Sequence, residues 1–262
     1  GLSNVRVKWR WEGDDREEGA ALVGEGNVLQ AEIPAAELGR VVYYQIEAEQ
    51  ENGTKIEYPQ NPADHWYEAF YGEVIPVYCT DFESDADLLA WSDALLAGED
   101  REGANDWMHG GLQSTPGSGD PTEAYSGNKV VGNDLGGGDY NGMYQPDKTN
   151  VLISPSVNVG KYENVHLQYR RWLNVEDSFF DRATIYANDV PVWTNYSAGE
   201  NGDTHHEDKE WRFHSIDVSD QLYRGGVQIK YELQTDGGLE MGGWTIDDFC
   251  IVAFVEPEPE VP

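Results

Sequence analysis

The residues best suited to chemistry are acids near the two ends of a long segment of the chain. Asp81 and Glu83 lie near its start, and Asp247 and Asp248 lie near its end. Asp81 and Glu83 are two residues apart, so on a strand both carboxylates point to one face. If the first and last strands of the segment lie side by side, these acids come close to Asp248. Their repulsion would then be relieved by Ca²⁺, which takes about six to eight oxygen ligands.

The two cysteines of the chain, Cys79 and Cys250, decide whether those strands meet. A disulfide between them would restrict the unfolded chain by about 5 kcal/mol in the chain-entropy model, and it would indicate an oxidising compartment. The alternative is a pair of free, buried thiols. Asp106 or a loop carbonyl could complete the calcium ligand shell, whereas the alternative for the acids is simple solvation, with Asp247 capping a turn.

Other catalytic signatures are missing from the sequence. It contains no HExxH zinc motif, no GxSxG, no CxxC and no P-loop. Residues 205–208 (HHED) form a dense polar cluster, but adjacent histidines on a strand point to opposite faces, which suits a metal poorly. We expect this cluster to be a surface loop. Acids are too numerous for a glycosidase pair to be chosen by spacing, so the sequence predicts a protein that is not an enzyme.

Aromatic side chains offer a second kind of chemistry, which is stacking on sugar rings. The aromatic residues in loop-like or strand-end positions are Trp107, Tyr140, Tyr144, Trp193 and Tyr196. Because tryptophan is highly buried on average, the alternative is that most of them belong to the core. Trp172 and Trp244 lie inside strand patterns, and we expect both to be core residues.

The charge balance excludes some partners. The 262 residues include 49 acids and 17 Lys or Arg, which gives a formal net charge of −32. Such a field disfavours nucleic acid and anionic membranes, and it favours divalent cations, cationic partners or a salty surrounding. No stretch approaches the ~20 apolar residues of a membrane span. An acidic surface that merely keeps an extracellular protein soluble is the simpler explanation of the same charge.

Residues 1–76 read as a small β domain. Apolar and polar residues alternate over 5–11, and 41–48 is a second predicted strand. Asn52-Gly53 is predicted to form a hairpin turn because both residues tolerate positive φ. The Ile33-Pro34 step, Gly39 and the VVYYQIEAEQENG hairpin resemble the immunoglobulin- or fibronectin-III-like spacer domains of secreted bacterial enzymes. The resemblance implies a β-sandwich that orients its neighbours.

Residues 77–254 contain many short alternating runs with few helical patterns between them, which predicts a larger β-sandwich. One short helix is expected over 85–97. The Gly- and Asp-rich stretch 99–149 is long for a loop and should contain short strands and a functional rim. The last residues, 255–262, are acidic and Pro-rich and read as an extended linker or tail.

The order of several motifs in the second segment matches a known family. These are CTDFES at 79–84, NDWMHG at 105–110, AYSGNKVVGNDLGG at 124–137, NVLISPSVNVG at 150–160, DRATIYAND at 181–189, EWRFHSIDVSD at 210–220 and GGWTIDDFCI at 242–251. They resemble the MAM-like jelly rolls, with concanavalin-like sandwiches, that are attached to secreted metalloproteases of the immune-inhibitor-A type. The resemblance implies a structural calcium held by Asp81, Glu83, Asp247 and Asp248.

The sequence as a whole therefore predicts an all-β, calcium-stabilised, non-catalytic region of a secreted multidomain protein. Its role would be adhesion to an extracellular protein or glycan, or the positioning of a protease domain of the same polypeptide. Two alternatives stay open. One is a carbohydrate-binding module of a glycan-degrading enzyme, and the other is a structural subunit of a cell-surface or extracellular assembly.

Overall fold

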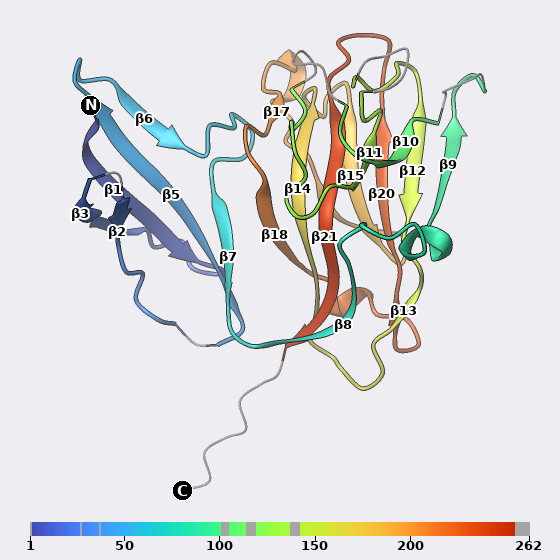
Figure 1. The fold of residues 1–262 in the computed structure, drawn as a ribbon, viewed down its shortest axis with the longest axis horizontal. Coiled ribbons are helices and arrows are strands. Elements are labelled where there is room, and N and C mark those ends of the chain that lie inside the picture. The colour runs from blue at the N-terminus through green and yellow to red at the C-terminus, as the bar shows by residue number, and fades with distance from the viewer. Residues whose placement is uncertain are drawn as a thin grey trace, which may run out of the picture.

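The chain folds into two β-sheet domains that lie side by side (Figure 1). The computed structural model describes residues 2–26, 28–36, 38–100, 105–113, 119–136 and 142–254. These residues form strands and three short 3-10 helices, so the predicted all-β fold is confirmed. No helix in the described ranges has the length and apolar character that a membrane crossing requires. The predicted tail at 255–262 lies outside the described residues.

The first domain is a five-stranded antiparallel sheet in which β5 is central, with β1 and β2 on one side, β6 on the other, and β7 also paired with β5. A small hairpin, β3–β4, stands apart from this sheet. The strands are β1 (Leu2–Trp11), β2 (Glu18–Ala21), β3 (Val23–Glu25), β4 (Val28–Gln30), β5 (Arg40–Gln50), β6 (Lys55–Tyr58) and β7 (Tyr67–Tyr71).

Alternation in β1 and β5 builds the core of this domain. Val7, Trp9 and Val42 are its buried apolar centre, as expected when every second side chain of a strand points to one face. The predicted hairpin turn at Asn52-Gly53 joins β5 to β6, and Gly53 has a φ of 80°, which a residue without Cβ adopts freely.

The second domain is a sandwich of two sheets. One has seven strands in the order β10-β11-β21-β14-β17, with β18 paired to β14 and β8 paired to β21, and the other has five in the order β16-β15-β20-β12-β9. The elements are β8 (Val74–Thr80), η1 (Asp87–Ala90), β9 (Ser92–Ala97), β10 (Trp107–Gly110), β11 (Val130–Asn133), β12 (Thr149–Ile153), β13 (Val157–Asn158), β14 (Val165–Val175), β15 (Arg182–Ala187), β16 (Val190–Thr194), η2 (Gly199–Asn201), β17 (His206–Glu207), β18 (Arg212–Asp217), η3 (Ser219–Gln221), β19 (Gly226–Val227), β20 (Ile229–Gln234) and β21 (Gly243–Phe254).

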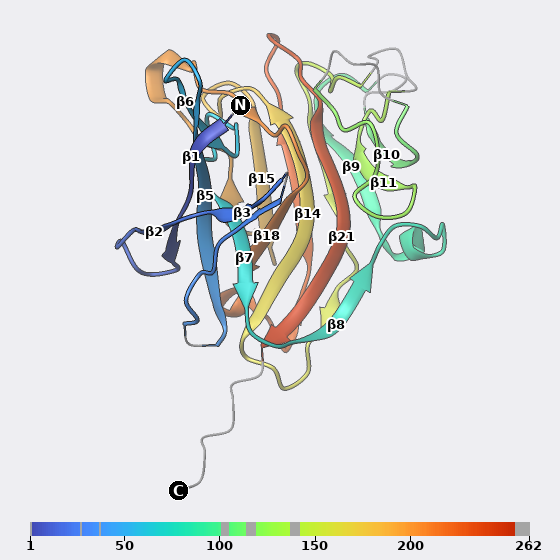
Figure 2. The ribbon, with the colours of Figure 1, turned by 60° about the vertical axis from the view of Figure 1, so that its left-hand side comes forward.

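The two sheets of the sandwich face each other (Figure 2), and its core side chains come from both of them. Leu167, Tyr169 and Leu173 of β14 point inward and are at most 1% exposed, and Tyr231 of β20 meets Tyr169 edge to face at 5.6 Å between ring centroids. The stretch 99–149 contains β10 and β11, as the sequence predicts.

The helix predicted over 85–97 is wrong. The chain forms a single 3-10 turn, η1, and then the edge strand β9, which pairs with β12 so that Leu95 lies opposite Asn150. The apolar residues here have mixed spacing and do not form the stripe that a buried helix needs. The free edge of β12 offers backbone hydrogen bonds instead, and Trp91 anchors the turn in the core.

Cys79 and Cys250 form a disulfide, so the prediction that they pair is confirmed. Their sulfurs are 2.05 Å apart, and the two residues are register partners on β8 and β21. The bond ties the first strand of the sandwich to its last strand and closes a loop with a sequence separation of 171 residues.

The two domains share an interface along β7 and β18 (Figure 1). The ring of Phe70 stacks on that of Phe254 with centroids 3.9 Å apart. Glu68 of β7 accepts hydrogen bonds from the backbone N–H of Ser215, at 2.9 Å, and contacts the ring of His214, at 3.1 Å. The first sheet therefore covers an edge strand of the second domain, which protects that edge from other pairing partners.

A buried ionic network joins the domains next to this edge. Arg171, which has no exposed surface, donates to Asp208 at 2.8 Å and to Asp64 of the first domain at 2.6 Å. Arg212 is 1% exposed and lies 3.5 Å from both carboxylates. Asn61 donates to Asp208 at 2.9 Å. Because Asp208 belongs to the HHED cluster, the expectation of a surface loop there is wrong: the first domain covers it.

Candidate functional site

Acids from the start and the end of the second domain converge on one loop, residues 125–129. Glu83 uses one carboxylate oxygen to accept the backbone N–H groups of Asn128, at 2.6 Å, and Lys129, at 2.7 Å. These two hydrogen bonds lower the pKa of Glu83. Gly127 has a φ of 57°, which residues with a Cβ rarely adopt, and a Cβ there would also lie 2.3 Å from this carboxyl group. Asp81 is exposed and accepts the backbone N–H of Glu83.

The closing acids hold the other side of the same loop. Asp247 is fully buried, and its two oxygens accept the backbone N–H groups of Ser126, at 2.9 Å, and Asp248, at 2.8 Å. Burial raises the pKa of Asp247 to about 6. The hydroxyl of Ser126 donates to Asp248 at 2.7 Å. Glu83, Asp247 and Asp248, from the two ends of the second domain, thus contact one loop, and the sequence reasoning missed the loop between them.

These hydrogen bonds determine which carboxylate oxygens of the four acids remain available to bind a cation. The described hydrogen bonds use one oxygen each of Asp81, Glu83 and Asp248 and both oxygens of Asp247. Carboxylate oxygens suit a hard cation, whereas the backbone groups described next to them are N–H donors, which do not bind one. None of the predicted ligands belongs to the single group of three ligand atoms within 4.8 Å of one another that the described residues contain.

Asp106 lies in a different place from the other predicted ligands. It is 6% exposed, and its carboxylate accepts the amides of Asn133, at 2.9 Å, and Asn150, at 3.0 Å, and the backbone N–H of Gln145, at 3.2 Å. Burial raises its pKa to about 6 despite these bonds. Its hydrogen bonds connect the start of β10 to β11 and β12. The carboxylate of Asp106 therefore holds these three strands together.

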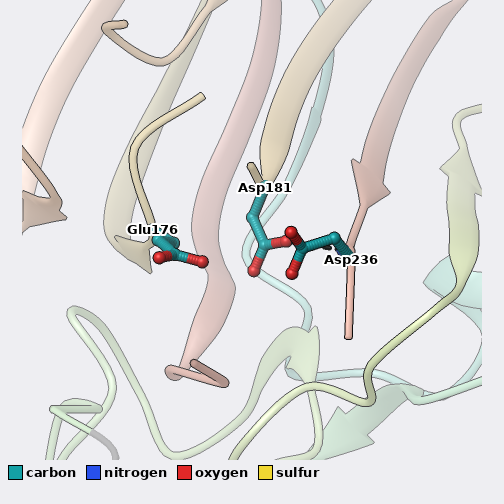
Figure 3. A group of neighbouring side chains, drawn as sticks. All are labelled: Glu176, Asp181 and Asp236. Atoms are coloured by element: carbon teal, nitrogen blue, oxygen red, sulfur yellow. Dashed lines mark hydrogen bonds between the residues drawn. The ribbon is translucent and has the colours of Figure 1, made fainter. Parts of the chain in front are cut away.

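Three further acids meet at the end of the sandwich where strands end or begin (Figure 3). Glu176 follows β14, Asp181 precedes β15, and Asp236 follows β20. One carboxylate oxygen from each lies within 4.8 Å of the others. Tyr144, predicted as an exposed aromatic, is fully buried and donates its hydroxyl to Asp181 at 2.6 Å. The sequence reasoning missed this group because its members are far apart in the chain.

The predicted stacking residues are in different environments. Trp107 is 8% exposed and belongs to the core, so its ring is not available to a sugar. Trp193 packs against the core, meeting Trp244 edge to face at 5.6 Å. Tyr196 is 53% exposed. Tyr140 lies outside the described residues.

A group of aromatic rings lies on the outer face of β14 and β18, and one of them, Trp172, was predicted to be a core residue. Trp172 alternates with the inward-pointing Leu173 and is therefore on the outer face of β14, so the expectation of a core residue is wrong there, whereas Trp244 is fully buried as expected. Arg170 shares this outer face with its register partner Phe213 of β18. We define the aromatic face as Tyr125, Arg170, Trp172, Trp211 and Phe213.

The aromatic face is held in place by the loop that precedes β11. The indole N–H of Trp172 donates to the carbonyl of Gly119 at 2.8 Å, and that of Trp211 donates to the carbonyl of Glu123 at 3.0 Å. The guanidinium of Arg170 lies 4.0 Å from the ring centroid of Tyr125, which is 43% exposed. Half-buried rings in fixed orientations can stack on an apolar ligand surface at little entropic cost.

The edge-to-face contacts extend the aromatic face across two strands and the loop. The rings of Trp172 and Trp211 are 5.9 Å apart, and those of Tyr125 and Trp211 are 6.4 Å apart. In the sequence, the signal was present as Arg170-Arg171-Trp172 and Trp211-Arg212-Phe213, but alternation alone does not say which side of a strand is covered.

The fold and these sites define an all-β protein in which a β-sheet domain is joined to a two-sheet β-sandwich. No protein-family model matches the chain. It is 28% identical over 218 residues to Bacillopeptidase F of Bacillus subtilis (strain 168), a match that covers 79% of this chain and 14% of that protein. The chain thus spans about one seventh of the relative it matches.

Solved β-structures give weaker similarities. The K1 cleaved adhesin domain of Lys-gingipain from Porphyromonas gingivalis W83 aligns over 70% of this chain and all of its own, with 16% identity and a TM-score of 0.41. The mannan-recognising carbohydrate-binding module TmCBM27 aligns over 70% of this chain and all of its own, with 14% identity and a TM-score of 0.39.

Proposed function

We propose that this chain is a non-catalytic, extracellular binding region of a larger protein, and that its aromatic face binds carbohydrate. The observation that carries the proposal is the exposed ring of Tyr125 beside the half-buried rings of Trp172 and Trp211 on the outside of a β-sheet. The C–H face of a pyranose ring packs on such rings, because both surfaces are apolar and flat. Grouped surface aromatics of this kind mark binding sites.

The net charge of the chain narrows the class of glycan that the aromatic face would bind. A net charge of −32 repels acidic polysaccharides over the whole surface. Arg170 is already placed between the rings of Tyr125 and Phe213, at 4.0 and 5.1 Å. A neutral glycan therefore fits the aromatic face better than an anionic one.

The proposed setting is a secreted peptidase-like polypeptide. The chain matches 14% of Bacillopeptidase F, as expected for an accessory part of a longer protein. The disulfide between Cys79 and Cys250 agrees with an extracellular location, because such bonds persist in oxidising compartments. In this proposal the chain anchors a peptidase domain to a glycan-bearing surface, and the chain alone hydrolyses neither peptides nor glycans.

A structural calcium at the loop of residues 125–129 is also part of the proposal. The acids Asp81, Glu83 and Asp248 each keep one oxygen outside the described hydrogen bonds; Glu83 and Asp248 contact this loop from opposite ends of the domain, and Asp81 lies two residues before Glu83. Replacing Asp248 by Asn tests the ligand set, because Asn tolerates the positive φ of 47° at this position. We expect the variant to bind one Ca²⁺ fewer than the native protein; an unchanged stoichiometry in titration calorimetry would remove calcium from this loop.

The glycan proposal is tested by a glycan array followed by titration calorimetry with the best neutral oligosaccharide. Replacing Tyr125 by Ala removes the most exposed ring of the aromatic face without opening the core. Since one aromatic contact contributes about 0.5–1.5 kcal/mol, we expect affinity to fall about two- to twelvefold.

Tyr223→Ala is the matched control. Tyr223 is 64% exposed and lies outside the aromatic face, next to Arg224. The Tyr223→Ala variant should bind glycan with the same affinity as the native protein. An array without any retained neutral glycan, or equal affinities for the Tyr125 and Tyr223 variants, would refute the proposal.

A further inference from the structure

Three aromatic rings meet where the two domains are joined. The chain leaves the first domain at the end of β7 and enters the second at β8, and β21 ends beside this crossing, with Val74 as the register partner of Phe254 (Figure 1). The ring of His166, on β14, lies 4.0 Å from that of Phe254 and 6.4 Å from that of Phe70 of the first domain, measured between centroids. We define His166, Phe70 and Phe254 as the clasp.

The ring of His166 is enclosed within the clasp. The residue is 4% exposed, and its Nδ1 lies 3.2 Å from the hydroxyl of Ser215 on β18. Its Nε2 lies 3.8 Å from a carboxylate oxygen of Asp217, an acid with 59% side-chain exposure. This distance is longer than a hydrogen bond, and water screens an exposed acid, so Asp217 compensates a charge on the ring only weakly. Burial outweighs Asp217 and lowers the pKa of His166 to about 4.

The acid Glu12, which follows β1, also acts at this joint. Burial raises the pKa of Glu12, and repulsion from Asp217 and Glu68 adds to the effect. Arg40, whose guanidinium donates to the carbonyl of Glu12, acts in the opposite direction. Because Asp217 belongs to the second domain, a proton on Glu12 removes repulsion between the domains. Glu12 therefore favours docking as the pH falls and opposes the effect of a charge on His166.

Two further histidines lie near the joint, but their contacts differ from those of His166. His214 of β18 pairs with the acid Glu68 of β7, with 3.1 Å between Nδ1 and a carboxylate oxygen. His206 is buried, which lowers its pKa, but its ring contacts Asp208 of the second domain. His166 is thus the histidine of this joint whose ring the first domain covers with an apolar side chain.

We propose that the clasp is an acid-sensitive joint, in which a proton on His166 loosens the docking of the first domain against β18. With the domains docked, the charged ring is held between Phe70 and Phe254, away from water. With the domains apart, Phe70 is withdrawn and water solvates the ring, so the charge costs less there. Residues 72–73, between β7 and β8, are the point about which the first domain turns. The clasp shares no residue with the aromatic face, so this inference does not rest on the glycan proposal.

The size of the effect follows from the two protonation equilibria of His166. The docked ring has a pKa of about 4, whereas a histidine in water has a pKa of about 6.5. The open state therefore binds the proton more tightly, and docking is strongest above about pH 6.5 and weakens as the pH falls toward 4. Between about pH 7 and pH 5, the ratio of open to docked chains should rise by at most about 20-fold. This is an upper limit, because Phe254 still covers part of the ring in the open state.

A nuclear magnetic resonance titration of the histidine rings in the full chain tests the coupling directly. If docking lowers the pKa of His166, protonation must weaken docking by the same factor, because linkage is reciprocal. The variant Phe70→Ala uncovers one side of the ring, so the pKa of His166 should be higher in this variant than in the native protein by at least about 0.5. His65, an exposed residue of the first domain, is the internal control and should titrate identically in both proteins.

Small-angle X-ray scattering measures the loosening itself. We expect the maximum dimension of the native protein to increase from about pH 7 to about pH 4.5, and to return when the pH is restored. The variants His166→Gln and His166→Phe cannot take up this proton and should keep one dimension throughout, whereas His65→Gln should open as the native protein does. Far-ultraviolet circular dichroism at both pH values checks that the sheets persist. Equal pKa values of His166 in native protein and Phe70→Ala, or equal scattering changes in native protein and the His166 variants, would overturn the inference.

Discussion

The ionic network between the domains gives the sharpest prediction of stability. Replacing Asp64 by Ala removes a carboxylate that contacts both Arg171, at 2.6 Å, and Arg212, at 3.5 Å. The two guanidinium groups are at most 1% exposed, and among the described residues the carboxylates within 4.0 Å of both are those of Asp64 and Asp208. The variant therefore leaves one buried positive charge uncompensated.

The expected loss is about 3–5 kcal/mol of unfolding free energy, which is the usual cost of removing one partner from a buried ion pair. In a domain of this size, each kcal/mol lowers the unfolding midpoint by about 2–4 °C, so the shift should be about 6–20 °C. The assays are urea unfolding, which gives the free energy, and thermal unfolding, which gives the midpoint temperature, of the full chain, each followed by tryptophan fluorescence and far-ultraviolet circular dichroism.

Glu17→Ala provides the control within the same domain. Glu17 pairs with Lys8 at 3.4 Å, but its side chain is 48% exposed, so this substitution should cost at most about 1 kcal/mol. If Asp64→Ala costs no more than the control, the domains are held together by apolar contacts such as Phe70 with Phe254, and the reasoning is refuted.

The pH dependence of the same variant supplies an independent check. Burial alone would raise the pKa of Asp64, but Arg171 and Arg212 outweigh it and hold the pKa well below its usual range. A depressed pKa in the folded state gives stability that is present above the usual value near 4 and is lost as the pH falls below it. The difference in unfolding free energy between the native protein and Asp64→Ala should therefore shrink as the pH falls from about 4 to about 2. A difference that stays constant over this range would contradict the charge argument.

Three further predictions concern single features. Reduction of the Cys79–Cys250 bond, or replacement of both residues by Ala, should lower the unfolding free energy by at most about 5 kcal/mol. Urea unfolding with and without reductant measures this loss. Burial raises the pKa of Asp181 to about 6, so in chelator the stability of the native protein relative to Asp181→Asn should fall by up to about 1.4 kcal/mol per unit as the pH rises from 4 to 6; a rise would contradict this sign. Trp107→Ala should cost about 3–5 kcal/mol because the ring is in the core, whereas the exposed Tyr196→Ala should change stability by less than about 0.5 kcal/mol in the same urea assay.

Strand positions could be predicted from the sequence because alternation is a local property. The β5 and β14 patterns, the Asn52-Gly53 turn and the absence of long helical stripes all follow from neighbouring residues, and the structure confirms them. The helix over 85–97 failed because a short apolar run without clear periodicity takes the structure that its tertiary neighbour offers, in this case the free edge of β12.

The sites depended on contacts that no local pattern encodes. Trp172 has the spacing of a core residue, but it points away from the second sheet, whereas Asp208 sits in a charged cluster that reads as solvated and is buried by the first domain. The orientation of a strand toward one layer or the other depends on which sheet faces it. Sequence alternation fixes two faces without saying which is covered.

By itself, the sequence determined that this protein is made of strands, that its acids greatly outnumber its bases, and that the only two cysteines bracket one domain. The tertiary structure decided which of those acids meet. Glu176, Asp181 and Asp236 are separated by up to 60 positions and are brought together because three strands end at the same rim. Their closeness follows from sheet order and register, and these are set by the burial of the whole core rather than by any short segment.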